Sequence, residues 1–242
     1  MKPIPTFLFI AALSFSNLSA DTNTTKIKHL KKDINYEEKL KESLQVLKID
    51  LKNSATDNNM TIAFDNNKVG YYYNKMSKTE IASKYYAKAV KIAENQTKPY
   101  SKQKTVYFNN LATAYEKLNK LSDALKYYEK ALKIYKDKLP EGHPYIASTS
   151  FDIGNVYEKM KKKDKAIEYQ LDALKIRKKS LRPLDHPDTI ASYDKILKLY
   201  TDAKNYDMVL KYGNELLELV NADTKTILEK KLNKIKELNK NK

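Results

Sequence analysis

Three histidines are the side chains in this sequence that could do acid–base or metal chemistry near neutral pH. His143 and His186 lie 43 residues apart and each precedes a proline, Pro144 and Pro187, whereas His29 lies in a polar stretch with no candidate partner nearby. Proline is favoured in the first turn of a helix, so we expect both His-Pro pairs to begin helices. No carboxylate or cysteine recurs around them with ligand spacing, which favours a structural role over catalysis or metal binding.

Other reactive groups are equally sparse. Carboxylate pairs such as Glu37 and Glu38 are typical of a helix start rather than of a buried acid and base. The chain has no cysteine, hence no disulfide, thiol nucleophile or thiolate metal site. The glycine-rich phosphate loops, the serine-hydrolase elbow and the zinc-protease motif are all absent from the sequence. We therefore predict a non-enzymatic protein without a cofactor or a metal ion.

The scarcity of glycine indicates which elements the chain forms. Only 4 of 242 residues are glycine, while 41% are apolar. Hairpin-rich β folds and nucleotide-binding turns need residues that tolerate positive φ, and this chain has few of them. The apolar fraction is nevertheless sufficient for a packed core. The composition predicts an all-α protein.

The net charge of +16 would ordinarily suggest nucleic acid or an anionic membrane surface as a partner. However, all but two of the 46 basic residues are lysines, the exceptions being Arg177 and Arg182. Proteins that read nucleic acids rely on arginine for two-pronged contacts with phosphate and guanine. The accompanying wealth of lysine, asparagine, isoleucine and tyrosine is typical of an AT-rich genome. We therefore disfavour nucleic acid as a partner.

Residues 1–20 have the organisation of a secretory signal peptide. Lys2 precedes the apolar run Phe7–Leu13, and the small residue Ala20 stands before Asp21. The apolar run is shorter than the roughly 20 residues that a membrane-spanning helix requires. We expect export to the bacterial periplasm or the medium, with no transmembrane span once the signal is removed. An uncleaved anchor stays an alternative, because Leu18 replaces the small residue preferred three positions before the cut.

The remainder of the chain repeats itself with a period of 42 or 43 residues. A small residue (Gly70, Ala112 and Gly154 in the first three copies) is followed three positions later by a tyrosine, which recurs as Tyr73, Tyr115, Tyr157 and Tyr200. A fixed period of this size indicates stacked repeats. Four copies fill residues 57–220, with boundaries near 57–98, 99–142, 143–185 and 186–220.

Each copy is predicted to form two antiparallel helices. In the second copy one apolar face of a first helix is formed by Phe108, Leu111, Ala112 and Tyr115, and Ser122 is the predicted N-cap of the second helix. A small side chain where the helices cross lets the backbones approach, and the tyrosine fills the space beside it. Because one hairpin cannot bury its apolar face alone, the hairpins must stack into an α-solenoid.

Residues outside the repeats fit the same architecture. Residues 21–56 contain a polar leader and then a helix over Tyr36–Leu51, which begins with a capping box formed by Asn35 and Glu38. Residues 221–242 are predicted to form a capping helix that covers the last repeat through a leucine-rich stripe: Leu228, Leu232, Ile235 and Leu238.

The repeat pattern resembles the tetratricopeptide repeat (TPR). The period and the strings F-N-N-L-A-T-A-Y (108–115), Y-Y-E-K-A-L-K-I-Y-K-D-K-L (127–139), E-G-H-P and L-D-H-P-D are similar to the 42-residue variant of kinesin light chains. Gln170 departs from the pattern in the third copy, and Leu197, Val209, Gly213 and Leu216 depart in the fourth. The resemblance implies a right-handed superhelix in which the first helices line a concave groove that holds a peptide or a partner helix.

On this chain the stripe that the resemblance assigns to the groove is rich in asparagine and lysine. Asparagine can both donate to and accept from a bound peptide backbone, and a row of lysines favours acidic ligands. For each residue, a merely solvated position is the competing interpretation. The candidate groove residues are Asn67, Tyr71, Asn74, Lys75, Asn109, Thr113, Glu116, Lys117, Phe151, Asn155, Glu158, Lys159, Asp194 and Lys198.

Two functions follow as hypotheses. The first is an exported scaffold or adaptor that binds a protein or an extended peptide, preferentially an acidic one, in this groove. The chaperone-binding lysine and asparagine clamp of some family members does not occur here, so a chaperone tail is disfavoured as the ligand. The alternative is a polycationic protein that binds anionic envelope polymers or lipid headgroups through its lysine-rich outer faces, with strong salt sensitivity.

Overall fold

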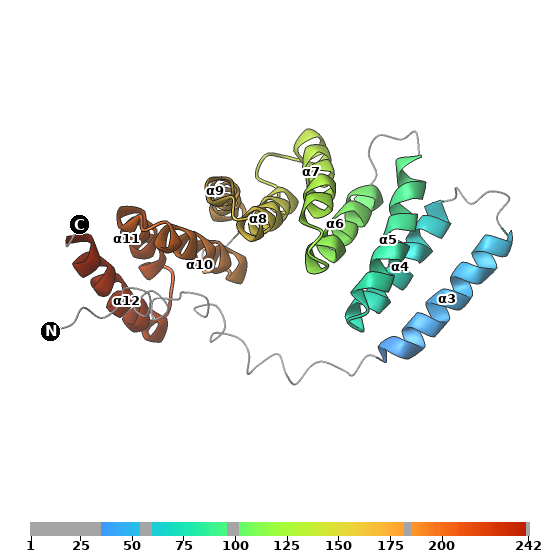
Figure 1. Ribbon diagram of the computed structural model, residues 1–242, viewed down its shortest axis with the longest axis horizontal. Helices are drawn as coiled ribbons and strands as arrows, with labels where there is room; N and C mark the ends of the chain where they lie inside the picture. The colour runs from blue at the N-terminus through green and yellow to red at the C-terminus, as the bar shows by residue number, and fades with distance from the viewer. Residues whose placement is uncertain (1–34, 54–59, 96–101, 182–184, 241–242) are drawn as a thin grey trace. The chain divides into compact units, whose positions relative to one another are not determined.

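The computed structural model describes residues 35–53, 60–95, 102–181 and 185–240, and every regular element in these ranges is an α-helix (Figure 1). The helices divide into two units, α3 to α7 and α8 to α12. The predicted signal peptide and most of the polar leader lie outside the described residues. Among the described helices, none combines the length and the apolar character that a membrane span requires.

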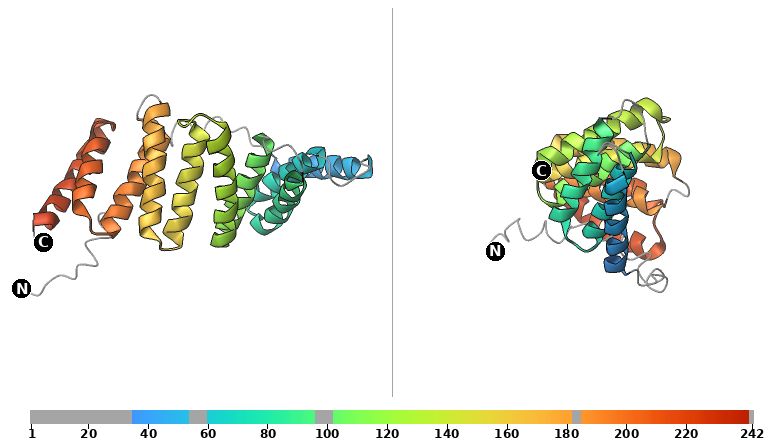
Figure 2. Two further views of the ribbon diagram at one scale, coloured as in Figure 1. Left: turned by 90° about the horizontal axis from the view of Figure 1, so that it is seen from above. Right: turned by 90° about the vertical axis from the view of Figure 1, so that its right-hand side faces the viewer.

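Both units are built from antiparallel helix hairpins, as the sequence predicts, and each of the four predicted repeats contains one hairpin (Figure 2). The first helix of every hairpin is 16 residues long. The first unit consists of α3 (Tyr36–Asn53), α4 (Met60–Lys75), α5 (Thr79–Glu94), α6 (Lys102–Lys117) and α7 (Leu121–Lys138). The second consists of α8 (Pro144–Lys159), α9 (Lys163–Ser180), α10 (Pro187–Asp202), α11 (Tyr206–Leu217) and α12 (Ala222–Lys240).

The recurrent tyrosine closes each hairpin through its backbone. Its carbonyl accepts a hydrogen bond, at 2.8 to 2.9 Å, from the amide five residues later. The residue just before that amide has a positive φ of 56° to 60° in every hairpin. This arrangement is the Schellman motif, which satisfies carbonyls at a helix C-terminus. The four residues with positive φ are Ser77, Asn119, Lys161 and Lys204.

The ring of the same tyrosine packs against a second tyrosine twelve residues later, in the facing helix. Ring centroids are 5.5 to 6.0 Å apart, and three of the four pairs are stacked. The prediction that this tyrosine fills the space beside the helix crossing is confirmed. The pairs are Tyr73 with Tyr85, Tyr115 with Tyr127, Tyr157 with Tyr169, and Tyr200 with Tyr212.

The small residues lie at close helix crossings, as predicted. A Cβ atom at Gly70 would lie 2.8 Å from the Tyr86 ring, and one at Gly154 would lie 2.7 Å from Nε2 of Gln170. Tyr86 and Gln170 occupy equivalent positions in their repeats. Gln170 replaces the expected tyrosine and uses its amide to donate to the Phe151 carbonyl at 3.1 Å.

The predicted N-cap of α7 was wrong. The helix begins at Leu121, and its N-cap is Lys120, which makes no side-chain capping bond. The Schellman turn leads directly from Asn119 into the cap position, and the Lys120 carbonyl already accepts from the Ala124 amide at 3.0 Å. Ser122 therefore lies inside the first turn. In the fourth hairpin the equivalent residue, Asn205, does cap its helix by accepting from the Met208 amide.

The helices at the two ends pack against the neighbouring hairpins. Asn35 Oδ1 accepts from the Glu38 amide at the start of α3, which packs on the first hairpin through Leu40 and Leu47. At the other end α12 covers the fourth hairpin, with Leu232 against Gly213. Gly213 departs from the repeat pattern because a side chain there would collide with Leu232.

Replacement of Gly154 by valine should destabilise the protein by about 1–3 kcal/mol, because the added carbons would displace Gln170 from its bond with Phe151. Thermal and urea unfolding followed by circular dichroism measures the change. Gly142→Ala is the matched control, since no described atom lies within 4 Å of a Cβ at that site. Equal stability of the two variants would contradict the close crossing.

Replacement of Lys161 by glycine should stabilise the protein by about 0.5–1 kcal/mol, because a side chain at positive φ is strained and glycine is not. Lys161→Ala keeps the Cβ atom and should give no gain. Asn119→Gly should gain less, since asparagine tolerates this conformation. The same unfolding measurements apply, and a loss of stability in Lys161→Gly would refute the strain argument.

Candidate functional site

The two repeated histidines are N-caps. Nδ1 of His143 accepts from the Tyr145 amide, and Nδ1 of His186 accepts from the Asp188 amide, both at 3.2 Å. Each is followed by proline at the first helical position, so the expectation that the His-Pro pairs begin helices is confirmed. Their ring nitrogens satisfy backbone amides that the helix itself leaves unpaired.

The strongest candidate for acid–base chemistry is Asp65 on α4. Burial first, and then its hydrogen bond and proximity to Asp50, raise the pKa of Asp65 to about 6. Burial and the nearby Asp65 raise the pKa of Tyr107 to about 12. Asp65 is only 4% exposed, so it belongs to the interior rather than to an accessible site. Among the described residues, no group of histidines and carboxylates could hold a metal ion.

In the first unit, predicted groove residues form hydrogen bonds between α4 and α6, which are the first helices of two neighbouring repeats. Asn110 Nδ2 donates to Asn67 Oδ1 at 2.8 Å, and Lys117 Nζ donates to Asn74 Oδ1 at 3.0 Å. In both pairs the partners are 43 residues apart, so α4 and α6 lie side by side in register. Asn110 was not predicted; it directly follows Asn109, which is the equivalent of Asn67 in the second repeat.

Three further predicted residues, all on α6, contact tyrosine hydroxyls of α7. Asn109 Nδ2 donates to the Tyr135 hydroxyl at 3.3 Å, and Thr113 shares a hydrogen bond of 2.9 Å with the Tyr128 hydroxyl. The Tyr128 hydroxyl also donates to Glu116 at 3.2 Å. These side chains are therefore held in place by the hairpin rather than surrounded by solvent alone.

Two aromatic side chains of α4 are exposed on the face of the helix that also carries Asn67 and Asn74. Tyr71 is 42% exposed, and the Lys75 amine lies 5.3 Å from its ring centroid. Phe64 is 53% exposed and precedes Tyr71 by seven residues, which places both on one side of the helix. Val106, 39% exposed, is the equivalent of Phe64 in the next repeat. Phe64 and Val106 were missed because isolated apolar residues resemble core positions in a sequence.

In the second unit the predicted residues of α8 are also fixed by neighbours. Asn155 Oδ1 accepts from Gln170 at 3.2 Å. The Arg177 guanidinium lies 4.5 Å from the Phe151 ring centroid and donates to the Ser192 hydroxyl at 2.7 Å. Arg177 is 5% exposed, so it binds α8 and α10 together from the interior. Sequence reasoning did not find this role.

Glu158 connects α8 to α10. It accepts from Lys195 at 2.9 Å and from Lys198 at 2.7 Å. Burial opposes ionisation of Glu158, but the two lysine hydrogen bonds outweigh it and hold its pKa below the usual value. Of the other predicted residues, Lys159 is exposed at the end of α8 and Asp194 is buried on α10. Apart from the buried Asp194, the predicted residues thus lie on two surfaces, which we call the α4–α6 surface and the α8–α10 surface, one in each unit.

Comparison with known proteins agrees with this architecture. A sequence profile of the tetratricopeptide repeat matches residues 61–137, and a second profile of the same repeat matches residues 147–180. The chain is a tetratricopeptide repeat protein. TPR proteins generally mediate protein–protein interactions as scaffolds, and the family is generally non-enzymatic. No curated protein matches the chain.

Solved structures show where the TPR fold of this chain recurs. A putative kinesin light chain of Podosopora anserina with nearly identical TPR-like repeats is 16% identical, with a TM-score of 0.63 over 83% of this chain and 87% of that one. BtubC (BKLC) from P. vanneervenii is 15% identical, with a TM-score of 0.63 over 85% and 84%. MamA is 20% identical, with a TM-score of 0.56 over 76% and 82%. The likeness to the kinesin light chain repeats confirms the predicted fold.

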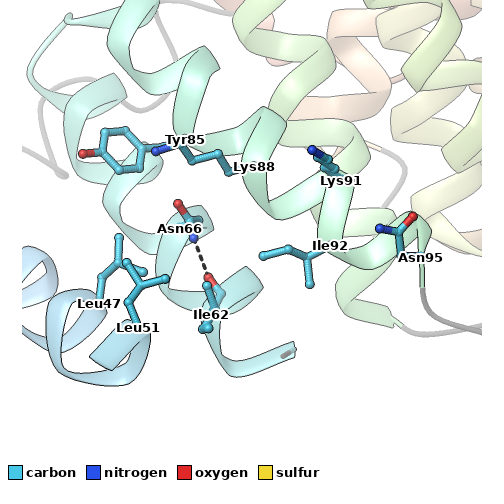
Figure 3. Close-up of a pocket in the computed structure, with 9 residues that line it drawn as sticks. All are labelled: Leu47, Leu51, Ile62, Asn66, Tyr85, Lys88, Lys91, Ile92 and Asn95. Carbon is cyan, nitrogen blue, oxygen red and sulfur yellow. Dashed lines mark hydrogen bonds between the residues drawn. The ribbon is translucent and has the colours of Figure 1, made fainter. Parts of the chain in front are cut away.

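The first unit of the TPR protein also contains a cleft. This cleft, of about 640 Å³, lies between α3, α4 and α5 (Figure 3). None of the predicted groove residues lines it. Its lining residues are Leu47, Leu51, Ile62, Asn66, Tyr85, Lys88, Lys91, Ile92 and Asn95.

Glu158→Gln should lower stability at pH 7 by about 0.5–1 kcal/mol, because two partly exposed ion pairs are lost. The pKa of Glu158 is depressed in the folded state, so its contribution is present above the pKa of the unfolded chain and disappears as the pH falls through the folded value. The difference between variant and wild type should therefore shrink below about pH 4. Urea unfolding across this range tests it.

Glu168→Gln is the control for this series, because Glu168 is exposed on α9 and forms no ion pair with a described residue. It should change stability little at any pH. A Glu158→Gln effect that is the same at pH 3 and at pH 7 would show that the ion pairs do not stabilise the α8–α10 surface.

Proposed function

We propose that this TPR protein is an exported, non-enzymatic scaffold that binds a protein segment or an extended peptide along the first helices of its repeats. The observation that carries the proposal is the pair of hydrogen bonds, Asn110 to Asn67 and Lys117 to Asn74, that aligns α4 with α6. Asn67 and Asn109, and likewise Lys75 and Lys117, are equivalent in the first two repeats, so an elongated ligand would meet an asparagine and a lysine on both α4 and α6. Such a surface suits an extended partner.

The chemistry of the α4–α6 surface supports a peptide as the ligand. Asn67 and Asn74 carry amides that can both donate and accept hydrogen bonds. The exposed rings of Phe64 and Tyr71 offer apolar anchors of the kind that contribute most of the affinity at protein interfaces. The lysines at the end of these helices favour an acidic partner.

The surface is also preorganised. Asn109 and Thr113 are held by hydroxyls of α7, and Asn67 and Asn74 are held by α6. Side chains that are already ordered lose less conformational entropy when a ligand binds. A ligand would then gain most from the exposed aromatic residues, which makes these the positions to test.

A photo-crosslinking phenylalanine analogue placed at position 64 or 71 should capture the same partner in the native cells, because both positions are exposed on one face of α4. The matched control is position 81, since Ile81 is also exposed but lies on α5. Mass spectrometry of the crosslinked products identifies the partner, and Tyr71→Ala should weaken its binding by about tenfold.

Several outcomes would overturn the proposal. Identical products from positions 64, 71 and 81 would exclude a defined α4–α6 interface. Salt-sensitive binding of anionic polymers that survives Tyr71→Ala would favour the polycationic alternative. The same cells test export: the mature protein should begin at Asp21 and occur in the envelope or the medium, whereas a cytosolic product that begins at Met1 would contradict it.

A further inference from the structure

The cleft between α3, α4 and α5 is separate from the α4–α6 surface, because none of the predicted groove residues lines it. Its volume of about 640 Å³ lies within the range of roughly 300–1,000 Å³ that is typical of ligand sites. In Figure 3, Leu47 and Leu51 approach Ile62 from α3, while Ile92 lies across the cleft on α5. All of these residues belong to one unit, which fixes the geometry of the cleft.

The base of the cleft is aliphatic. Leu47 and Ile62 are buried there, whereas Leu51, in the last turn of α3, is 44% exposed. The other leucines of α3, Leu40, Leu44 and Leu47, pack against the first hairpin, whereas Leu51 is exposed. A ligand with branched apolar side chains would remove this surface from water.

One side of the cleft is positively charged. Lys88 and Lys91 extend from α5, three residues apart, and no carboxylate is among the lining residues. Some other lysines form ion pairs, for example Lys130 with Glu94 and Lys178 with Glu215. Lys88 lies 5.1 Å from the Tyr85 ring centroid, and no described carboxylate lies within ion-pair distance of Lys91.

We propose that this cleft binds an acidic amphipathic peptide segment of a protein partner, with its aliphatic side chains on Leu51 and Ile92 and its carboxylates on Lys88 and Lys91. The spacing of the two lysines matches carboxylates three or four residues apart on a helical ligand. Asn95 at the end of α5 adds an exposed amide that suits a peptide backbone and has no use in binding an acyl chain.

A fluorescein-labelled amphipathic peptide built from leucine and glutamate is the probe, and the full-length protein is titrated into it. Binding should be about tenfold tighter than that of the same peptide with lysine in place of glutamate, or with serine in place of leucine. Raising the salt concentration should weaken it.

Variants with matched controls assign the binding to the cleft. Leu51→Ser should weaken the glutamate peptide by about tenfold, while Val46→Ser, a similarly exposed change on α3 outside the cleft, should not. Lys91→Glu should weaken binding of the glutamate peptide and strengthen binding of the lysine peptide. Lys84→Glu makes the same charge change on α5 outside the cleft and should leave both affinities unchanged.

Three results would overturn the proposal. Equal effects of Lys91→Glu and Lys84→Glu would mean that only the net charge matters. Equal binding of the glutamate and lysine peptides would remove the charge complementarity. Dodecanoate, a fatty-acid anion, is the third probe. If it binds more tightly than the peptide and its binding depends on Leu51, the cleft is a fatty-acid site instead. None of these results affects crosslinking from positions 64 and 71, so the two sites succeed or fail independently.

Discussion

Close contact between the two helices of each hairpin is the interaction on which the rest of the structure depends. Gly70 and Gly154 leave room for Tyr86 and Gln170 from the facing helix, and a stacked or tilted tyrosine pair fills the space nearer the turn. The carbonyl of the same recurrent tyrosine closes the turn. One position thus contributes a ring to the core and a backbone acceptor to the turn, which explains why it recurs in all four repeats. A hairpin closed in this way still exposes an apolar face, so it must stack on another hairpin.

Stacking in turn produces the surfaces on which we propose that a partner binds. Side chains that join neighbouring first helices, such as Asn110 with Asn67 and Glu158 with Lys195, also line the faces on which a partner would bind. A substitution in these pairs would therefore change stability as well as the proposed recognition. Phe64 and Tyr71 are exposed and contribute little to the core, so a substitution there would affect mainly the proposed recognition. The α3 cleft differs, because it arises where an added helix meets the first repeat rather than from the repeat itself.

Much of the fold could be predicted because the repeat period is a local, recurrent pattern. The small residue, the tyrosine and the His-Pro helix starts each occur more than once at the repeat spacing. Recurrence at a constant spacing identifies a repeat even where a single copy would not. The N-cap of α7 was missed because it depends on the turn geometry at Asn119 rather than on residue type. Asn110, Arg177 and Lys195 were missed because each acts through a residue that is distant along the chain: Asn67, Ser192 and Glu158.

The sequence by itself determined the helical class, the hairpin unit and the TPR repeat, since period and apolar pattern depend only on helix geometry and the need to bury one face. It also located the stripe of candidate binding residues. Only the tertiary structure decided which of those residues are held by neighbours and which aromatic rings stay exposed. It alone formed the cleft between α3, α4 and α5, because the exposure of Leu51 and the absence of an ion pair at Lys91 among the described residues depend on how three helices meet. Burial and pairing are properties of the assembled helices, and no single segment contains them.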